Sequence, residues 1–209
     1  QTYFFFIKHL IFVFISLSLI FLISIQEKEK LIKVFTYLFI VSIVLLFSTL
    51  FFGVEIKGSR RWIELSPFPR FQPVELLKPL FIIFVAKIMV LNETIDINKR
   101  YFYSFIVLLG VVMILINQPD LGQTLLLTLT WITMIFVSGF NMILLAILGL
   151  VFAITIALLI FFLPEKFGYV FERIKTFLDP KTGDNFQSQK ALEAIKQGGL
   201  TGQGMGEGI

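Results

Sequence analysis

The stretch that decides the fold reads Gly58-Ser-Arg-Arg-Trp-Ile-Glu-Leu-Ser-Pro-Phe-Pro-Arg-Phe-Gln-Pro-Val-Glu-Leu-Leu-Lys78. It is rich in charge, proline and aromatic residues, and it lies between two long apolar runs, residues 34–52 and 76–91. A polar segment between two apolar runs of this length indicates a loop at a membrane surface. We therefore expect these residues to face water or a polar ligand.

The composition points to the same class of protein. Hydrophobic residues make up 57% of the 209 residues, charged residues only 15%, and the mean hydropathy is +0.90. These values exclude an ordinary water-soluble domain and predict a polytopic membrane protein. The chain has no cysteine, which excludes a disulfide, a thiolate nucleophile and a cysteine metal site. The net charge of +4 is small for nucleic-acid binding, so the basic loops suggest anionic lipid or an anionic lipid-linked substrate.

Hydropathy predicts six membrane spans, of which the first is close to the length of about 20 apolar residues that crosses a bilayer. They lie near residues 3–25, 34–52, 73–91, 101–117, 123–137 and 142–163. Residues 164–209 form a polar, basic and finally glycine-rich tail, in which residues 185–197 predict an amphipathic helix on the bilayer surface. The chain begins Gln1-Thr2 without an initiator methionine, so we expect an earlier piece of the protein to precede it.

Counting spans places the loop at 53–72, the turn at 118–122 and the tail on one face of the membrane. Gln72-Pro73 and Gln118-Pro119 both predict a helix start, each followed by an acid, Glu75 or Asp120, in the first turn. These two acids are expected to line one polar cavity, and Lys78 shares a helix face with Glu75. Charge counting alone leaves the orientation in the membrane open.

Each of these residues also has a plainer interpretation. Arg60 and Arg61 suit interfacial anchors, and Trp62 suits an aromatic belt. Glu75 and Lys78 suit a structural ion pair, and Asp120 a helix cap. The glycine-rich tail lacks the Gly-Lys-Ser/Thr of a phosphate-binding loop and, taken alone, suits a flexible loop.

Five motifs together resemble the SEDS family (shape, elongation, division and sporulation proteins), and the resemblance covers essentially the whole chain. They are Gly-Ser-Arg-Arg-Trp-Ile from residue 58, Gln-Pro-Val-Glu-Leu-Leu-Lys from 72, Gln-Pro-Asp-Leu-Gly from 118, Phe-Leu-Asp-Pro from 177 and Gly-Gly-Leu-Thr-Gly-Gln-Gly from 198. The tail looks more like the division member FtsW than the elongation member RodA.

The resemblance implies an all-α membrane fold of about ten transmembrane helices, of which this chain is similar to the second through seventh and part of the large external loop that follows. It also implies a glycosyltransferase that polymerises lipid II, an undecaprenyl-pyrophosphate-linked disaccharide peptide, on the outer face of the bacterial cytoplasmic (inner) membrane during cell division. The partners it implies are a class B penicillin-binding transpeptidase, other division proteins and membrane lipid. No motif indicates a cofactor or a metal site, and a divalent cation requirement stays open.

The family's functional residues carry over by motif to this chain. They are an external loop with Arg60, Arg61 and Trp62, and a polar cavity with Gln72, Glu75, Lys78 and Asp120. Arg61 and Lys78 are expected to hold the pyrophosphate. The family's essential aspartate, the expected general base, is implied to lie beyond Ile209, so the chain by itself is expected to be inactive.

Two other functions remain open at this point. A lipid II flippase would need a cavity that opens to both sides of the membrane. A non-catalytic scaffold for the division complex would tolerate alanine at Glu75 and Asp120.

Overall fold

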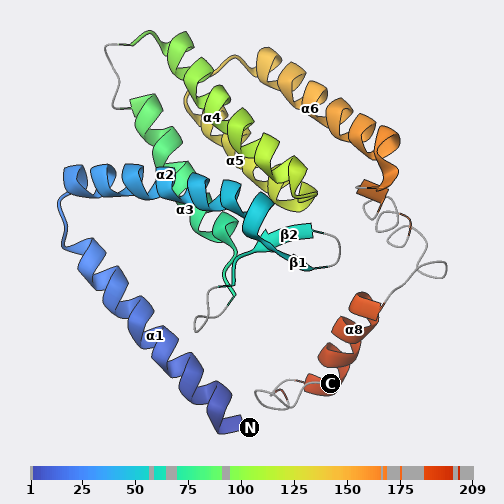
Figure 1. Cartoon of the computed structure of the whole chain (residues 1–209). Helices are drawn as coiled ribbons and strands as arrows, with labels where there is room; N and C mark the ends of the chain where they lie inside the picture. The colour runs from blue at the N-terminus through green and yellow to red at the C-terminus, as the bar shows by residue number, and fades with distance from the viewer. Residues whose placement is uncertain are drawn as a thin grey trace. The chain divides into compact units, whose positions relative to one another are not determined.

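The computed structural model describes residues 2–56, 59–64, 70–90, 95–165, 167–168, 175, 186–199 and 202. Its helices are α1 Thr2–Ser24, α2 Lys28–Phe52, α3 Pro73–Val90, α4 Ile97–Asn117, α5 Leu121–Val137, α6 Met142–Phe162 and α8 Phe186–Gly198 (Figure 1). Between α2 and α3 lies an antiparallel hairpin of β1 Val54–Ile56 and β2 Ser59–Trp62. The chain divides into two compact units, and the unit Glu27–Leu158 contains all of the polar contacts described below as the site.

The chain is an all-α polytopic membrane protein, as predicted. By length and composition, α1, α2, α4 and α6 can each cross a membrane. Helix α5 is apolar but only 17 residues long, and α3, with 18 residues, carries three charged side chains. Almost all of the apolar side chains of α1 and most of those of α6 are exposed, an arrangement that lipid accommodates and water does not. The six predicted spans correspond one to one to α1–α6.

Helix α3 is the centre of the unit Glu27–Leu158. It packs against α2, α4 and α5, and α4 packs against α5. Leu77, Phe81 and Val85 recur every four residues on one face of α3 and are fully buried. The Phe81 ring lies 6.4 Å, between centroids, from the buried ring of Phe39 on α2. This central position brings the charged first turns of α3 against the neighbouring helix ends.

Three helices begin before the residues at which the predicted spans start. Helix α2 begins at Lys28 and not at 34, α4 at Ile97 and not at 101, and α5 at Leu121 and not at 123. Hydropathy locates the apolar stretch, but a helix extends into the interface wherever its first N–H groups find acceptors. For α4 the acceptor is Asp96, whose Oδ1 lies 2.7 Å from the backbone N of Asn98.

The described residues between 53 and 72 include a β-hairpin and a further β-bridge where the sequence predicts a loop. The β1–β2 ladder pairs Glu55 with Arg60 and Val54 with Trp62, and a further bridge joins Ile63 to Phe71. Arg61 lies between the paired residues Arg60 and Trp62 as the extra residue of a β-bulge, and such a bulge redirects the side chain that it carries. Residues 65–69, with the two prolines expected to stiffen the loop, lie outside the described residues.

The start of α3 and the helix in the tail agree with the sequence. Helix α3 begins at Pro73, and the backbone N of Glu75 donates to the Gln72 carbonyl at 3.1 Å. Helix α8 lies within one residue of the predicted range 185–197. The Phe-Leu-Asp-Pro motif from residue 177 lies outside the described residues, as does the glycine-rich segment from 198 apart from Gly198, Gly199 and Gly202.

Candidate functional site

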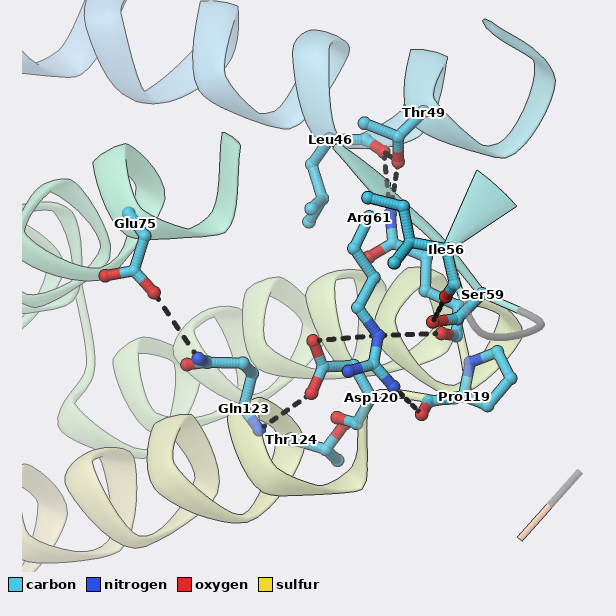
Figure 2. A network of polar contacts seen from close by, with 11 residues as sticks. Leu46, Thr49, Ile56, Ser59, Arg61, Glu75, Pro119, Asp120, Gln123 and Thr124 are labelled. Atoms are coloured by element: carbon cyan, nitrogen blue, oxygen red, sulfur yellow. Dashed lines mark hydrogen bonds and ion pairs between the residues drawn. The ribbon is translucent and has the colours of Figure 1, made fainter. Parts of the chain in front are cut away.

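Arg61 in β2 fastens the hairpin to the turn that precedes α5 (Figure 2). Its guanidinium Nη2 donates to the Pro119 carbonyl, its Nε donates to the Gln118 carbonyl at 3.3 Å, and Nε lies 3.4 Å from Asp120 Oδ2. A planar guanidinium suits such a set of acceptors because its N–H groups point in fixed directions. The Asp120 side chain is only 8% exposed, so this ion pair is poorly screened by solvent.

Asp120 both caps helix α5 and forms the ion pair with Arg61. It is the N-cap residue of α5, and its Oδ1 accepts from the backbone N of Gln123 at 3.4 Å while Oδ2 faces Arg61. Its own backbone N–H donates to the Leu115 carbonyl at 3.0 Å. The helix-cap interpretation is therefore correct, and the same carboxylate also holds a cation.

Gln118 ties the turn to α2. Its side chain is buried, and Nε2 donates to the Leu46 carbonyl at 3.1 Å and to the Thr49 hydroxyl. A buried amide with good partners fixes both segments in place. This role was not predicted from the sequence, although the Gln-Pro-Asp motif contains the residue.

Glu75 lies between a cation and an amide. The Lys78 ammonium is 2.7 Å from Glu75 Oε2. Gln123 Nε2 donates to Glu75 Oε1 at 3.4 Å (Figure 2). The Lys78 side chain is 24% exposed and that of Glu75 is 53% exposed. An ammonium has three N–H donors, so the contact with Glu75 leaves Lys78 with donors for a ligand.

These contacts form one connected set, which we name the charge network: Arg61, Asp120, Gln123, Glu75 and Lys78. Its members come from β2, the turn before α5, the first turn of α5 and the first two turns of α3. Glu75 and Asp120 both contact Gln123, so they lie close together, and the single polar cavity that they were expected to line stays a prediction. The sequence held a signal for the contact between Gln123 and Asp120 alone, since Asp120-Leu-Gly-Gln123 has the spacing of a capping box.

The other predicted site residues lie around the network. Arg60 pairs with Glu55 at 3.3 Å on the exposed side of the hairpin, Trp62 is half-buried in β2, and Gln72 contributes its backbone carbonyl to the start of α3. None of these three side chains has a described contact with the charge network. The described residues also contain no group of three or more His, Asp or Glu side chains that could hold a metal ion.

The arrangement suits an anionic ligand at the membrane surface. The two cations and two anions of the network cancel in net charge, which lowers the free-energy cost of placing these side chains at the bilayer. Arg61 already uses three acceptors, whereas Lys78 retains donors and is reachable from outside. The network therefore presents one ammonium, held in position by a carboxylate, to a phosphate or a similar anion.

Comparisons with known proteins agree with this site. The family model for FtsW, RodA and SpoVE, described as a cell cycle protein, matches residues 1–209. The probable peptidoglycan glycosyltransferase FtsW of Aliivibrio salmonicida is 30% identical over 100% of this chain and 52% of its own length. The peptidoglycan glycosyltransferase MrdB of Escherichia coli K12 is 30% identical over 80% of this chain and 45% of its own length.

Solved structures show the same fold. A peptidoglycan synthase complex that coordinates polymerization and crosslinking contains a chain that matches with a TM-score of 0.67 at 28% identity, over 90% of this chain and 56% of that one. The rod shape determining protein RodA of Thermus thermophilus matches with a TM-score of 0.57 at 31% identity, over 66% of this chain and 46% of that one. The chain spans about half the length of the relatives that it matches.

Proposed function

Because the chain belongs to the FtsW, RodA and SpoVE family of cell cycle proteins, we propose that the intact protein is a peptidoglycan glycosyltransferase that polymerises lipid II during cell division. The relatives named as peptidoglycan glycosyltransferases support the activity. The charge network is the observation on this chain that carries the proposal, since it offers a positioned cation to a lipid-borne pyrophosphate.

In the proposed reaction, the 4-hydroxyl of one lipid-linked disaccharide attacks the anomeric carbon of another. The bond from that carbon to the pyrophosphate oxygen breaks, and undecaprenyl pyrophosphate leaves with the electron pair. The hydroxyl proton passes to a general base, which the family resemblance implies lies beyond Ile209. The reaction needs no organic cofactor.

We assign the pyrophosphate to Lys78 in preference to Arg61. Negative charge develops on the leaving pyrophosphate, and a cation fixed in advance stabilises that charge without reorganising. Lys78 is fixed by Glu75 at 2.7 Å, and no other described residue accepts from its ammonium, which leaves donors for a ligand. The Arg61 guanidinium is occupied by the turn before α5, so its role is to hold the hairpin beside the site.

The one-sided position of the network favours polymerisation over flipping. Between Lys78 and Lys87, about 14 Å along the axis of α3, the inward face carries the buried residues Leu80, Phe81 and Val85. Lys87 is bound to the Thr36 hydroxyl at 2.9 Å. A flippase needs a polar path along this whole length, whereas a polymerase needs access from one side alone.

The proposed setting is the outer face of the bacterial cytoplasmic membrane, with a class B penicillin-binding transpeptidase as partner. The matching chain from a complex that coordinates polymerization and crosslinking supports this assignment. A polymerase and a crosslinking enzyme in one complex would deliver new strands directly to the transpeptidase.

The test is Lys78→Met in the intact protein, assayed for polymerisation of lipid II with its partner transpeptidase. We expect turnover to fall about 100-fold, because removing one preorganised group that stabilises developing charge has an effect of this size. Lys87→Met on the same helix is the matched control, and it should retain nearly full turnover because Lys87 binds Thr36 and not the network.

Equal turnover in wild type and Lys78→Met would remove Lys78 from the mechanism. Equal loss in both lysine variants would indicate damage to α3 and not to the site. Normal growth of cells that carry Lys78→Met, with the division complex still assembled, would favour the scaffold.

A further inference from the structure

We propose that Gln123 is a positioning residue that holds the Glu75 carboxylate, and through it the Lys78 ammonium, in register with the Arg61–Asp120 pair. Gln123 is the one described residue that contacts both acids of the charge network: its backbone N donates to Asp120 and its side chain to Glu75. The inference rests on the proposed function for its activity measurement.

The capping box at the start of α5 is only half formed, which leaves the Gln123 side chain available to bind Glu75. In a full box the residue at the third helical position returns its side chain to the N-cap backbone N–H. Here that N–H, on Asp120, already donates to the Leu115 carbonyl at 3.0 Å. The Gln123 side chain is therefore not needed by its own helix, and it crosses to Glu75 on α3 instead.

The orientation of the Gln123 amide lowers the stability of the folded protein. A carboxylate accepts hydrogen bonds and cannot donate, so the NH₂ of Gln123 must face Glu75 and its carbonyl oxygen must face away. That oxygen, Oε1, is buried and has no hydrogen-bond partner among the described residues. A buried acceptor without a donor lowers stability. Gln123 is thus poorly explained as a stabilising residue and better explained by what it does to Glu75.

Gln118 supplies the contrast within the same turn. Both hydrogens of its amide nitrogen have acceptors, on Leu46 and Thr49, and the side chain is 2% exposed. Its contacts lead into the packed interface with α2 and not to the charge network. Two glutamines five residues apart therefore have different expected roles, one in folding and one in the site.

A side-chain substitution at Gln123 removes the hydrogen bond to Glu75 and keeps the one to Asp120. The hydrogen bond to Asp120 comes from the backbone N of residue 123 and persists whatever the side chain is. Gln123→Leu therefore leaves the cap of α5 and the Arg61–Asp120 pair in place while it frees the Glu75 carboxylate.

The experiment compares Gln123→Leu with Gln118→Leu in the intact protein, by thermal unfolding and by lipid II polymerisation. We expect Gln123→Leu to melt within about 2 °C of wild type or above it, and to lose about tenfold in kcat, the modest effect of losing one long hydrogen bond to a charged group. Gln118→Leu should melt several degrees lower because it removes two buried hydrogen bonds to α2, those to Leu46 and Thr49. Unchanged kcat in Gln123→Leu would overturn the proposal.

A double-mutant cycle with Glu75→Ala tests whether Gln123 acts through Glu75. If it does, adding Gln123→Leu to Glu75→Ala should lower kcat by less than about twofold, because alanine has already removed the acceptor of the Gln123 side chain. Independent losses that multiply would show that Gln123 acts on something other than Glu75, and would overturn the proposal.

A measurement without activity separates this inference from the proposed function. A carbodiimide couples a carboxylate to an amine in contact with it, so the yield of the Glu75–Lys78 link in peptide mass spectra reports their alignment. We expect Gln123→Leu to lower this yield several-fold and Gln118→Leu to leave it unchanged. An unaltered yield in Gln123→Leu overturns the positioning role, whereas a lowered yield in a protein whose wild type does not polymerise lipid II overturns the proposed function alone.

Discussion

Arg61 and Asp120 show why single residues decide the geometry of this site. The guanidinium reaches two backbone carbonyls and a carboxylate on a turn 57 or more residues further along the chain. The carboxylate also caps α5. Breaking a partly buried pair of this kind is costly because the partner left behind keeps its charge without compensation.

Two substitutions at Asp120 separate the cap from the ion pair. Asparagine keeps an oxygen for the Gln123 N–H but loses the charge that faces Arg61, whereas alanine loses both. We expect Asp120→Asn to lower the free energy of unfolding by about 1–2 kcal/mol, and Asp120→Ala to lower it by about 1 kcal/mol more, the usual value of an N-cap. Thermal unfolding of the intact protein in detergent measures both.

Asp96 is the control, because it caps α4 through Asn98 and has no ion pair among the described contacts. Asp96→Asn should change stability by less than about 0.5 kcal/mol. If the two Asp→Asn variants melt alike, the Arg61–Asp120 pair does not contribute to stability.

At the scale of the elements, the junction between α2 and β1 determines where the hairpin points. The backbone N–H of Gly53 donates to the Thr49 carbonyl at 2.9 Å and ends α2, and β1 starts one residue later. A Cβ at Gly53 would lie 2.3 Å from that carbonyl oxygen and 3.1 Å from the Arg60 Cβ. The close approach leaves no room for a side chain, so glycine sets the angle between helix and hairpin.

Gly53→Ala is therefore expected to destabilise the protein by about 1–3 kcal/mol, as overpacking does. Because the backbone has to move to make room, Arg61 should also shift from its acceptors and turnover should fall. Gly110→Ala on α4 is the matched control, since nothing lies within 4 Å of its Cβ position, and alanine there should be neutral or stabilise the helix. Equal melting temperatures for the two variants would show that the junction tolerates a side chain.

Sequence patterns predicted the helices better than the hairpin. Apolar runs and Gln-Pro pairs located α1–α6, whereas β1 and β2 have only three and four residues, too few for an alternating pattern to identify a strand. Such short strands acquire their hydrogen bonds only from each other, so their existence depends on the register that the chain adopts around Gly53.

At the scale of the whole molecule, the exposed apolar faces of the helices and the family match both indicate a membrane protein. The chain matches the family model over residues 1–209 and spans about half of the relatives' length. FtsW of Aliivibrio salmonicida is 30% identical to it, and the rod shape determining protein RodA of Thermus thermophilus is 31% identical. Overall identity therefore does not separate division from elongation, and the proposed role in division rests on the likeness of the tail to FtsW.

Depletion of the intact protein in its host tests the proposed role in cell division. A division polymerase makes septal wall, so its loss should give filaments that elongate without completing septa. Fluorescent D-amino acid labelling should then disappear from midcell and persist along the side wall. Round cells with intact septa would instead assign the protein to elongation.

The sequence by itself determined the membrane class, the six apolar helices and the fact that Glu75 and Lys78 share a helix face, because these follow from composition and from the helical repeat. Counting spans also predicted that Glu75 and Asp120 lie at the same face of the membrane. Only the tertiary structure decided that Arg61 is held by the turn before α5, and that Gln118 and Gln123 connect segments far apart in the chain. The physical reason is that an amide or a guanidinium serves any nearby acceptor equally well, so its partner is chosen by the packing of α3 against α2 and α5.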